Sequence, residues 1–332
     1  MSLLTRGPEA GRNGLSSATI IPIDKDRPVH SDPGKSVVAV PPLAWNGDLT
    51  LNRAANAALI RHLEQGGVST LMYGGNANFY HLAPSDYAEV LDMLLELASP
   101  ATWVIPSAGP DFGKLKDQAK VLRTRPFPTA MVLPVSGMAT DAGTADGIGR
   151  FADSFGRPVI IYLKSETYLS VSSVTRLIDR GIVSAIKYAV VRDDPRQDAY
   201  LSELVRHVDK ARIISGIGER PAIAHWRHFG LRAFTSGSVS IAPRLSTALL
   251  AALKGGAYDE AESLRQAFLP FENARDEINP TRVLHDGVTF AGIADMGPIL
   301  PLLSNLSDSE GRKVAPLARE LLASDAAHAK AA

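Results

Sequence analysis

The feature of this sequence that most limits its fold is a regular alternation between short apolar runs and longer amphipathic segments. The runs consist mainly of apolar or β-branched residues, and the apolar residues follow one another without regular polar interruptions. This pattern indicates strands that are buried on both faces of a parallel sheet. A strand with one face in solvent would instead alternate apolar and polar residues. There are eight such runs, at residues 37–40, 70–73, 103–106, 130–133, 159–162, 184–187, 212–215 and 232–235.

Segments with helical spacing separate the runs. Between the first two, one helical stripe is formed by Leu51, Ala55, Leu59 and Leu63. Eight strand–helix units over about 220 residues predict an α/β fold, a (β/α)8 TIM barrel. A doubly wound open sheet is the main alternative, although such sheets usually have fewer strands.

The predicted division of the chain has three parts. Residues 1–35 are rich in Gly, Ser, Pro and charge and are expected to form an irregular N-terminal extension. Residues 36–255 hold the barrel. Residues 256–332 contain no strand-like run, so we expect a helical C-terminal appendage there.

Composition excludes several classes of function. The 332 residues carry 35 basic and 35 acidic side chains and no cysteine. The zero formal charge gives no support for a nucleic-acid partner, and disulfides, thiolate nucleophiles and cysteine–zinc sites are ruled out. The histidines show no metal-binding spacing, so we expect no metal. Neither a signal peptide nor a membrane span is indicated, and we expect a cytoplasmic protein whose partner is a small molecule.

Two residues at the ends of neighbouring runs suggest imine chemistry. Lys187 ends the sixth run and Tyr162 ends the fifth. A lysine among apolar walls loses solvation of its charged form, so its pKa falls and a free amine can attack a ketone. A phenol on the next strand can transfer the protons. In the simpler interpretation, the lysine reaches the surface and the tyrosine is a core residue.

Residues just past the other runs are the candidates for substrate binding, because barrel active sites form where strands end and loops begin. The loop with Gly75, Asn76 and Ala77 exposes successive N–H groups that can bind a carboxylate, although its glycines also suit a simple tight turn. The remaining candidates are Ser136, Lys164, Gly216 and Val239. The glycines after the seventh and eighth runs could instead hold a phosphate.

These residues resemble the dihydrodipicolinate synthase / N-acetylneuraminate lyase family of Schiff-base-forming class I pyruvate aldolases. The family carries Gly-Thr-Thr-Gly-Glu after strand two, where this chain has residues 74–78. The tyrosine of its Tyr-Asn-x-Pro segment matches Tyr162, and the lysine of its Gly-x-Lys matches Lys187. Its Ser-Gly and Gly-x-x-Ser segments are similar to residues 215–216 and 237–240.

The resemblance runs from about residue 37 to the C-terminus. It implies a barrel with a helical C-terminal region, a homo-oligomer (usually a tetramer, otherwise a dimer), and no cofactor beyond a covalent imine on Lys187. The keto-acid carboxylate would lie on the N–H groups of the loop after strand two. The sequence departs from the family in three places. Gly75 and Asn76 replace two threonines, Ser136 or its neighbour replaces a relay tyrosine, and Thr167 replaces an arginine that holds the second substrate.

The predicted function is therefore that of a Schiff-base lyase acting on pyruvate or a related 2-keto acid. Its reaction would be aldol cleavage or condensation, or dehydration of a 2-keto-3-deoxy sugar acid. The alternatives are a true 4-hydroxy-tetrahydrodipicolinate synthase, a phosphate-binding barrel enzyme, and a non-catalytic barrel that binds a keto acid.

Overall fold

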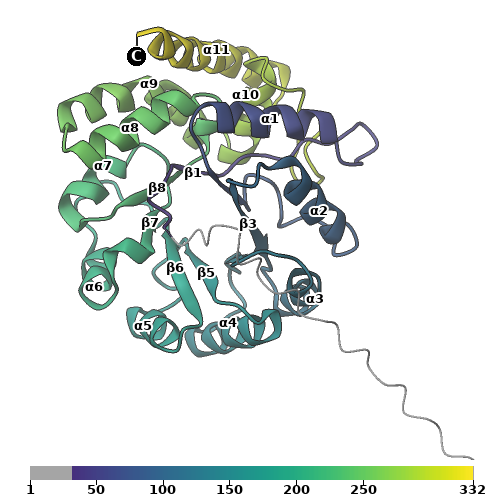
Figure 1. Cartoon of the computed structure of the whole chain (residues 1–332), viewed down its shortest axis with the longest axis vertical. Coiled ribbons are helices and arrows are strands. Elements are labelled where there is room, and N and C mark those ends of the chain that lie inside the picture. Colours follow the sequence, from purple (N-terminus) through teal and green to yellow (C-terminus); the bar gives the residue numbers. More distant parts are fainter. Residues whose placement is uncertain (1–31, 332) are drawn as a thin grey trace, which may run out of the picture.

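Each apolar run becomes a strand, and the eight strands close into one parallel barrel in sequence order (Figure 1). The computed structural model describes residues 32–331, so most of the predicted N-terminal extension lies outside the described residues. The strands are β1 (Val38–Ala39), β2 (Thr70–Tyr73), β3 (Trp103–Ala108), β4 (Met131–Val132), β5 (Val159–Leu163), β6 (Val183–Tyr188), β7 (Ile213–Ser215) and β8 (Ala233–Ser236). The barrel closes where β1 pairs with β8.

Helices surround the strands in the alternating order that the sequence predicts. They are α1 (Arg53–Gln65), α2 (Tyr87–Leu97), α3 (Phe112–Arg123), α4 (Asp141–Phe155), α5 (Val171–Asp179), α6 (Ala199–His207), α7 (Ala222–Ala224) and α8 (Pro243–Gly255). The predicted TIM barrel is confirmed. In the seventh unit, α7 continues into a short π-helical turn over His225–Phe229 instead of one regular helix.

The helical appendage is also confirmed. It contains α9 (Tyr258–Glu277), α10 (Pro280–Phe290) and α11 (Asp308–Ala331). The second of these, α10, begins with Pro280 at its first position after an Asn279 cap. α9 and α11 pack on α8, and α10 packs on α9 and α11, at one side of the barrel (Figure 1). No helix within residues 32–331 is both long and apolar enough to cross a membrane.

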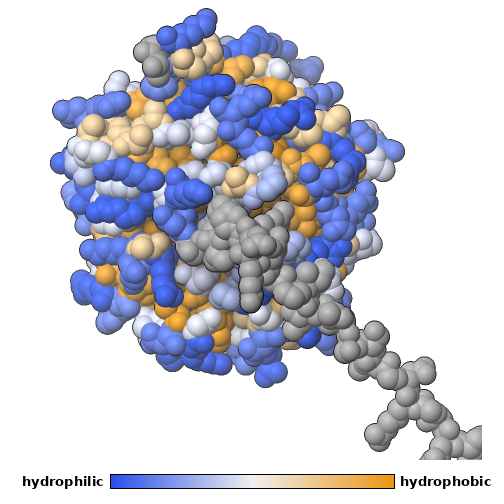
Figure 2. Space-filling model, in the orientation of Figure 1, coloured by the Kyte–Doolittle hydropathy of each residue, from blue (hydrophilic) through white to orange (hydrophobic). Residues whose placement is uncertain are grey.

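Side-chain direction inside the barrel follows from the pairing register. Lys187 pairs with Tyr162 across β6 and β5, and both side chains extend to the inside. The next residue, Tyr188, points outward and donates a hydrogen bond to Asp198 at the start of α6. Alternation of this kind places every second residue of a strand in the barrel interior. On the face shown in Figure 2, polar residues cover most of the helices, and apolar residues show mainly between them.

The last helix supplies a cap to α8. The residue before α8, Ala242, has no side chain that can cap the helix. Asp325 of α11 is fully buried and accepts a hydrogen bond from the Leu245 N–H at 2.9 Å and another from Arg244 at 3.0 Å. A carboxylate at a helix N-terminus satisfies an unpaired N–H and interacts favourably with the helix dipole. This contact fixes the appendage to the barrel.

We predict that Asp325→Ala lowers the free energy of unfolding by about 2–4 kcal/mol, because a cap is lost and a buried charge pair is broken. Ser324→Ala, at an exposed neighbouring position of α11, should change it by less than about 0.5 kcal/mol. Denaturant titration of the two variants checks this. If the two variants unfold at the same denaturant concentration, Asp325 does not hold α11 to α8.

Candidate active site

The lysine and tyrosine predicted to carry the chemistry meet inside the barrel. The Nζ atom of Lys187 lies 4.1 Å from the centroid of the Tyr162 ring. Lys187 is only 5% exposed, and none of the residues in the described part of the chain forms a hydrogen bond or salt bridge with its Nζ. The amine therefore lies against the phenol ring with no partner that would hold its protons.

The surroundings of the two groups move their pKa values apart. Burial lowers the pKa of Lys187 to about 7, and the positive charges of Lys164 and Arg275 add to this effect. Burial raises the pKa of Tyr162 to about 12, with Arg275 opposing the rise. Near neutral pH the lysine can thus lose its proton while the tyrosine keeps its own, so a nucleophile and a proton donor stand side by side.

Two further tyrosines, Tyr80 and Tyr168, lie close to this pair. Burial raises the pKa of Tyr168 to about 12. The pKa of Tyr80 is raised by burial and also by the charges that Tyr162 and Tyr168 would carry if ionised. Neither tyrosine was among the candidate site residues predicted from the sequence. Tyr168 follows Tyr162 in the loop after β5, and its position in that loop was the one signal that could have suggested it.

The loop after β2 is held by its side chains and leaves backbone donors unused. Asn76 donates from Nδ2 to the Val40 carbonyl at 2.9 Å, and Asn78, at a φ of 57°, donates to the Leu300 carbonyl at 3.3 Å. In the described part of the chain, the N–H groups of Gly75, Asn76 and Ala77 have no hydrogen-bond acceptor. Three successive unpaired N–H groups are the kind of donor set that binds an anion.

The interior just below this loop contains an unpaired hydroxyl. Ser107 of β3 is fully buried, and its Oγ has no hydrogen-bond partner among the described residues. A Cβ atom on Gly74 would lie 2.9 Å from this Oγ and 2.8 Å from the Met131 Cε. Glycine at position 74 therefore keeps space open beside the hydroxyl.

The other predicted binding residues have different surroundings. Gly216 lies beside the catalytic candidate, since a Cβ atom there would be 3.0 Å from the Lys187 Cγ. Lys164 is exposed, and its Nζ is 5.9 Å from the Tyr162 ring centroid. Val239 is fully buried, and its N–H bonds to the Ser236 Oγ at 2.9 Å. Ser136 is exposed and lines, with Tyr168, a cavity of about 850 Å³ between α3 and α4.

A residue of the appendage also reaches this region, and no sequence signal indicated it. Arg275 of α9 bonds through Nη1 to Glu272 at 2.9 Å and to the Ser238 Oγ at 3.4 Å. Ser238 itself donates to Glu272 at 2.5 Å. Burial and the nearby Glu272 carboxylate raise the pKa of a second buried acid, Glu219, to about 7. Arg275 thus compensates the buried Glu272 carboxylate, and its positive charge also lowers the pKa of Lys187 and opposes the rise in the pKa of Tyr162.

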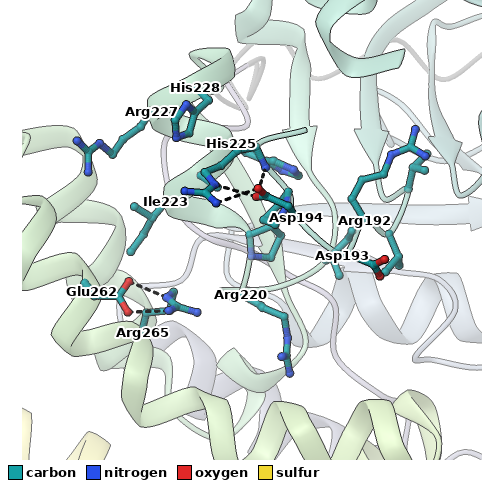
Figure 3. Close-up of a pocket in the computed structure, with 17 residues that line it drawn as sticks. Arg192, Asp193, Asp194, Arg220, Ile223, His225, Arg227, His228, Glu262 and Arg265 are labelled. Carbon is teal, nitrogen blue, oxygen red and sulfur yellow. Dashed lines mark hydrogen bonds and ion pairs between the residues drawn. The ribbon is translucent and has the colours of Figure 1, made fainter. Parts of the chain in front are cut away.

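A second cavity, of about 580 Å³, lies beside the loop after β6 (Figure 3). Of the arginines that line it, Arg192, Arg196, Arg220 and Arg265 form ion pairs with carboxylates of the chain, and Arg227 stacks over the Tyr258 ring. Arg196 bonds to Asp194 at 2.8 Å, and Arg265 bonds to Glu262 at 2.6 Å. His225, at its inner wall, is buried and bonds to the Ser215 side chain at 2.8 Å. These contacts indicate a structural region, and the unpaired reactive groups are at the barrel interior instead.

No cluster of three or more potential metal ligands occurs within residues 32–331. The chemistry available to the described site is that of an amine, several phenols, backbone N–H donors and two nearby cations.

Comparison with known proteins finds relatives of low sequence identity and solved structures of the same fold. No family model matches the chain. Curated proteins from two Acinetobacter baumannii strains, named "Probable 5-dehydro-4-deoxyglucarate dehydratase", are 22% identical over 279 residues, which is 82% of this chain and 90% of each relative.

Solved structures of similar fold include dihydrodipicolinate synthase from Oceanobacillus iheyensis, with a TM-score of 0.77 and 22% identity over 86% of this chain and 95% of that one. Another is a prophage protein of the dihydrodipicolinic acid synthase family from E. coli K12 in complex with pyruvate, with a TM-score of 0.76 and 19% identity over 86% and 98% of the two chains. The predicted family resemblance is confirmed. The relatives that these comparisons name are a dehydratase and a synthase, together with a further protein of the synthase family.

The contact between Gly216 and the lysine yields a test of the site geometry. A Cβ atom at position 216 would lie 2.6 Å from the Tyr188 carbonyl oxygen and 3.0 Å from the Lys187 Cγ. We predict that Gly216→Ala displaces the lysine and slows its reaction with a 2-keto acid at least about tenfold, because reacting groups tolerate little misplacement.

Gly255→Ala is the matched control, because a Cβ atom there would meet nothing within 4 Å. Both variants are assayed by the rate of borohydride-trapped adduct formation. A Gly216→Ala variant as fast as Gly255→Ala would show that the space around the Lys187 stem is not limiting.

Proposed function

We propose that this chain is a Schiff-base-forming lyase that acts on a 2-keto acid, with dehydration of a 2-keto-3-deoxy sugar acid as its reaction. The observation that carries the proposal is the buried, unpartnered Lys187 amine beside the Tyr162 phenol, with pKa values of about 7 and about 12. This pair is the minimum that imine chemistry requires, namely a neutral amine and a protonated acid at the same pH.

The reaction begins with imine formation. The neutral Nζ of Lys187 attacks the ketone carbon, and one amine proton passes to the carbonyl oxygen. Tyr162 donates a second proton to that oxygen, which leaves as water, and a positively charged iminium remains. The substrate carboxylate lies on the unpaired N–H groups of residues 75–77, and this fixes the ketone carbon in front of the amine.

The elimination follows from the charge on the iminium. The Tyr162 phenolate takes a proton from C3, and the electron pair forms an enamine. The enamine expels the C4 hydroxyl as the C4–O bond breaks, and a phenol proton converts the leaving hydroxyl to water. Addition of water to C2 then releases the keto acid and restores Lys187. The net change is the loss of one water molecule.

Two observations favour dehydration over condensation. The relatives with sequence similarity are named for dehydration of 5-dehydro-4-deoxyglucarate. Position 167, where the resemblance places the arginine that holds the second substrate of a synthase, is a threonine here.

The phosphate-binding alternative is not favoured. The glycines that would cradle a phosphate are already in contact with other side chains. A Cβ atom on Gly218 would lie 2.9 Å from a Glu272 carboxylate oxygen, and a carboxylate at this place repels an anion.

The family resemblance supports the remaining parts of the proposal. We propose a cytoplasmic homo-oligomer, either a tetramer or a dimer, that uses no cofactor other than the Lys187 imine.

We predict that pyruvate and borohydride produce a reduced adduct on Lys187 and that Lys187→Met abolishes it. The trapping rate should rise as the pH passes about 7 and then level off, because the lowered pKa frees the amine there and not near the ordinary lysine value of about 10.5. Peptide mass spectrometry across a pH series checks both statements. An adduct on another lysine, or none with any 2-keto acid, would refute the proposed function.

We predict that Tyr162→Phe slows turnover by about 10²–10⁴-fold, the usual contribution of a general acid–base group, while keto-acid binding changes little. Steady-state rates and calorimetric affinities measure the two effects separately. Tyr188→Phe is a useful comparison, because that phenol points out of the barrel and bonds to Asp198. If Tyr162→Phe keeps the native kcat, Tyr162 does not transfer the proton.

A further inference from the structure

We infer that the segment joining α10 to α11 is a positioning element of the active site, because it holds the loop that binds the substrate carboxylate. We call this segment, residues 291–307, the arm; it contains no helix or strand. The inference rests on the proposed function, since it concerns the carboxylate subsite of that reaction. Both helices belong to the appendage (Figure 1), so the arm connects the appendage to the site.

The arm contacts two neighbouring loops of the barrel. In the loop after β1, Trp45 donates its N–H to the Met296 carbonyl at 3.0 Å. In the loop after β2, the Asn78 Nδ2 donates to the Leu300 carbonyl at 3.3 Å. Since β1 and β2 are paired and parallel, these loops emerge side by side, at the end of the barrel where Lys187 stands on β6. The arm therefore bridges the two loops.

A glycine lets the arm lie directly against the first of these loops. Gly297 has a φ of 66°, and a Cβ atom there would lie 1.9 Å from the Trp45 carbonyl oxygen. Backbone of the arm thus touches backbone of the loop. Gly292, at the start of the arm, has a φ of 74°, but a Cβ atom there would meet nothing within 4 Å. The two glycines share a backbone conformation and differ in whether they touch the barrel.

Buried polar side chains of α10 fix the arm in this place. The Nε2 atom of His285 lies 3.0 Å from the Gly297 carbonyl oxygen. Asn305 accepts a hydrogen bond from the Ile299 N–H at 3.1 Å, and its Nδ2 donates to Asp286 at 2.7 Å. His285 and Asp286 are both buried. Because the arm is tied to α10 at two separate points, it is a fixed support for the loops that it touches.

The support matters because the loop after β2 turns sharply at Asn78. The Asn78 N–H donates to the Gly75 carbonyl at 3.0 Å, and its φ of 57° lies in the left-handed region that residues other than glycine seldom adopt. Asn78 is 4% exposed, so the bond to Leu300 satisfies a carboxamide that is shielded from water.

The same turn carries the carboxylate donors. The N–H groups of residues 75–77, which have no acceptor in the described part of the chain, all lie between the two ends of the Gly75–Asn78 hydrogen bond. Fixing Asn78 on the arm therefore fixes the direction of these donors. Hydrogen bonds weaken steeply when they are misaligned, so the arm sets how well the carboxylate is held.

The competing explanation is that these contacts only stabilise the fold. The test therefore compares two probes of nearly equal size, pyruvate and its neutral amide, pyruvamide. Both carry the ketone that reacts with Lys187, but only pyruvate carries the carboxylate. A general loss of structure slows borohydride trapping of both probes equally, whereas a misplaced carboxylate loop slows the trapping of pyruvate more. Calorimetry with lactate, which has the carboxylate but no ketone, measures the subsite even when no imine forms.

The first variant, Gly297→Ala, forces the arm away from Trp45. Its matched control is Gly292→Ala, because both glycines have a positive φ and only Gly297 meets the barrel. The cost of placing alanine at a positive φ is therefore common to the two variants.

The second variant, Asn78→Gly, removes the bond to Leu300 and keeps a residue that tolerates a positive φ. Its control is Asn46→Gly, which removes an exposed asparagine of the loop after β1 whose side chain bonds to Thr50 at 2.9 Å. If Gly297→Ala does not fold, Asn78→Gly decides the question.

We expect Gly297→Ala and Asn78→Gly each to lower the ratio of pyruvate to pyruvamide trapping rates about tenfold, a typical effect of losing one hydrogen bond to a charged group, and to weaken lactate binding similarly. Both controls should keep the native ratio within about twofold. A folded arm variant with the native ratio and the native lactate affinity, or one that slows both probes equally, would overturn the inference. Failure of pyruvate to label Lys187 in the native protein would instead overturn the proposed function.

Discussion

Burial of one lysine amine beside a phenol determines the protonation states of the two groups and hence the chemistry that the site can perform. Taking an ammonium group out of water is costly, and no carboxylate in the described part of the chain compensates Lys187. The fold accepts this cost because the strands around β6 are fixed by the closed barrel and its ring of helices. The lysine consequently gives up its proton near neutral pH, whereas the same burial makes Tyr162 hold its proton more firmly.

Glycines follow three of the strands, and each leaves space for a different group: Gly74 beside the Ser107 hydroxyl, Gly216 beside the Lys187 stem, and Gly237 beside the Arg275 guanidinium. The carboxamides of the loop after β2 bond to neighbouring carbonyls, so its backbone donors remain unpaired. The appendage contributes as well, because the positive charge of Arg275 on α9 lowers the pKa of Lys187, and because α11 is fixed to α8 through Asp325.

Much of this could be predicted from the sequence, and the limits have physical reasons. Buried parallel strands appear in a sequence as continuous apolar runs. The local pattern therefore predicted all eight strands, and it predicted that Lys187 and Tyr162 stand at the ends of neighbouring strands. Arg275 was missed because its place depends on how α9 packs on α8 and on the turn after β8, long-range contacts that no local spacing encodes. Tyr80 and Tyr168 lie on irregular loops, whose side-chain directions do not follow from periodicity.

A crystal structure of the protein soaked with pyruvate would show whether Lys187 forms the imine. We expect continuous density from the Lys187 Nζ to the ketone carbon, with the Tyr162 oxygen within hydrogen-bond reach of the reacting atoms and the carboxylate on the N–H groups of residues 75–77. Pyruvate bound without a covalent bond to Lys187, or bound elsewhere with this interior left unchanged, would contradict this expectation.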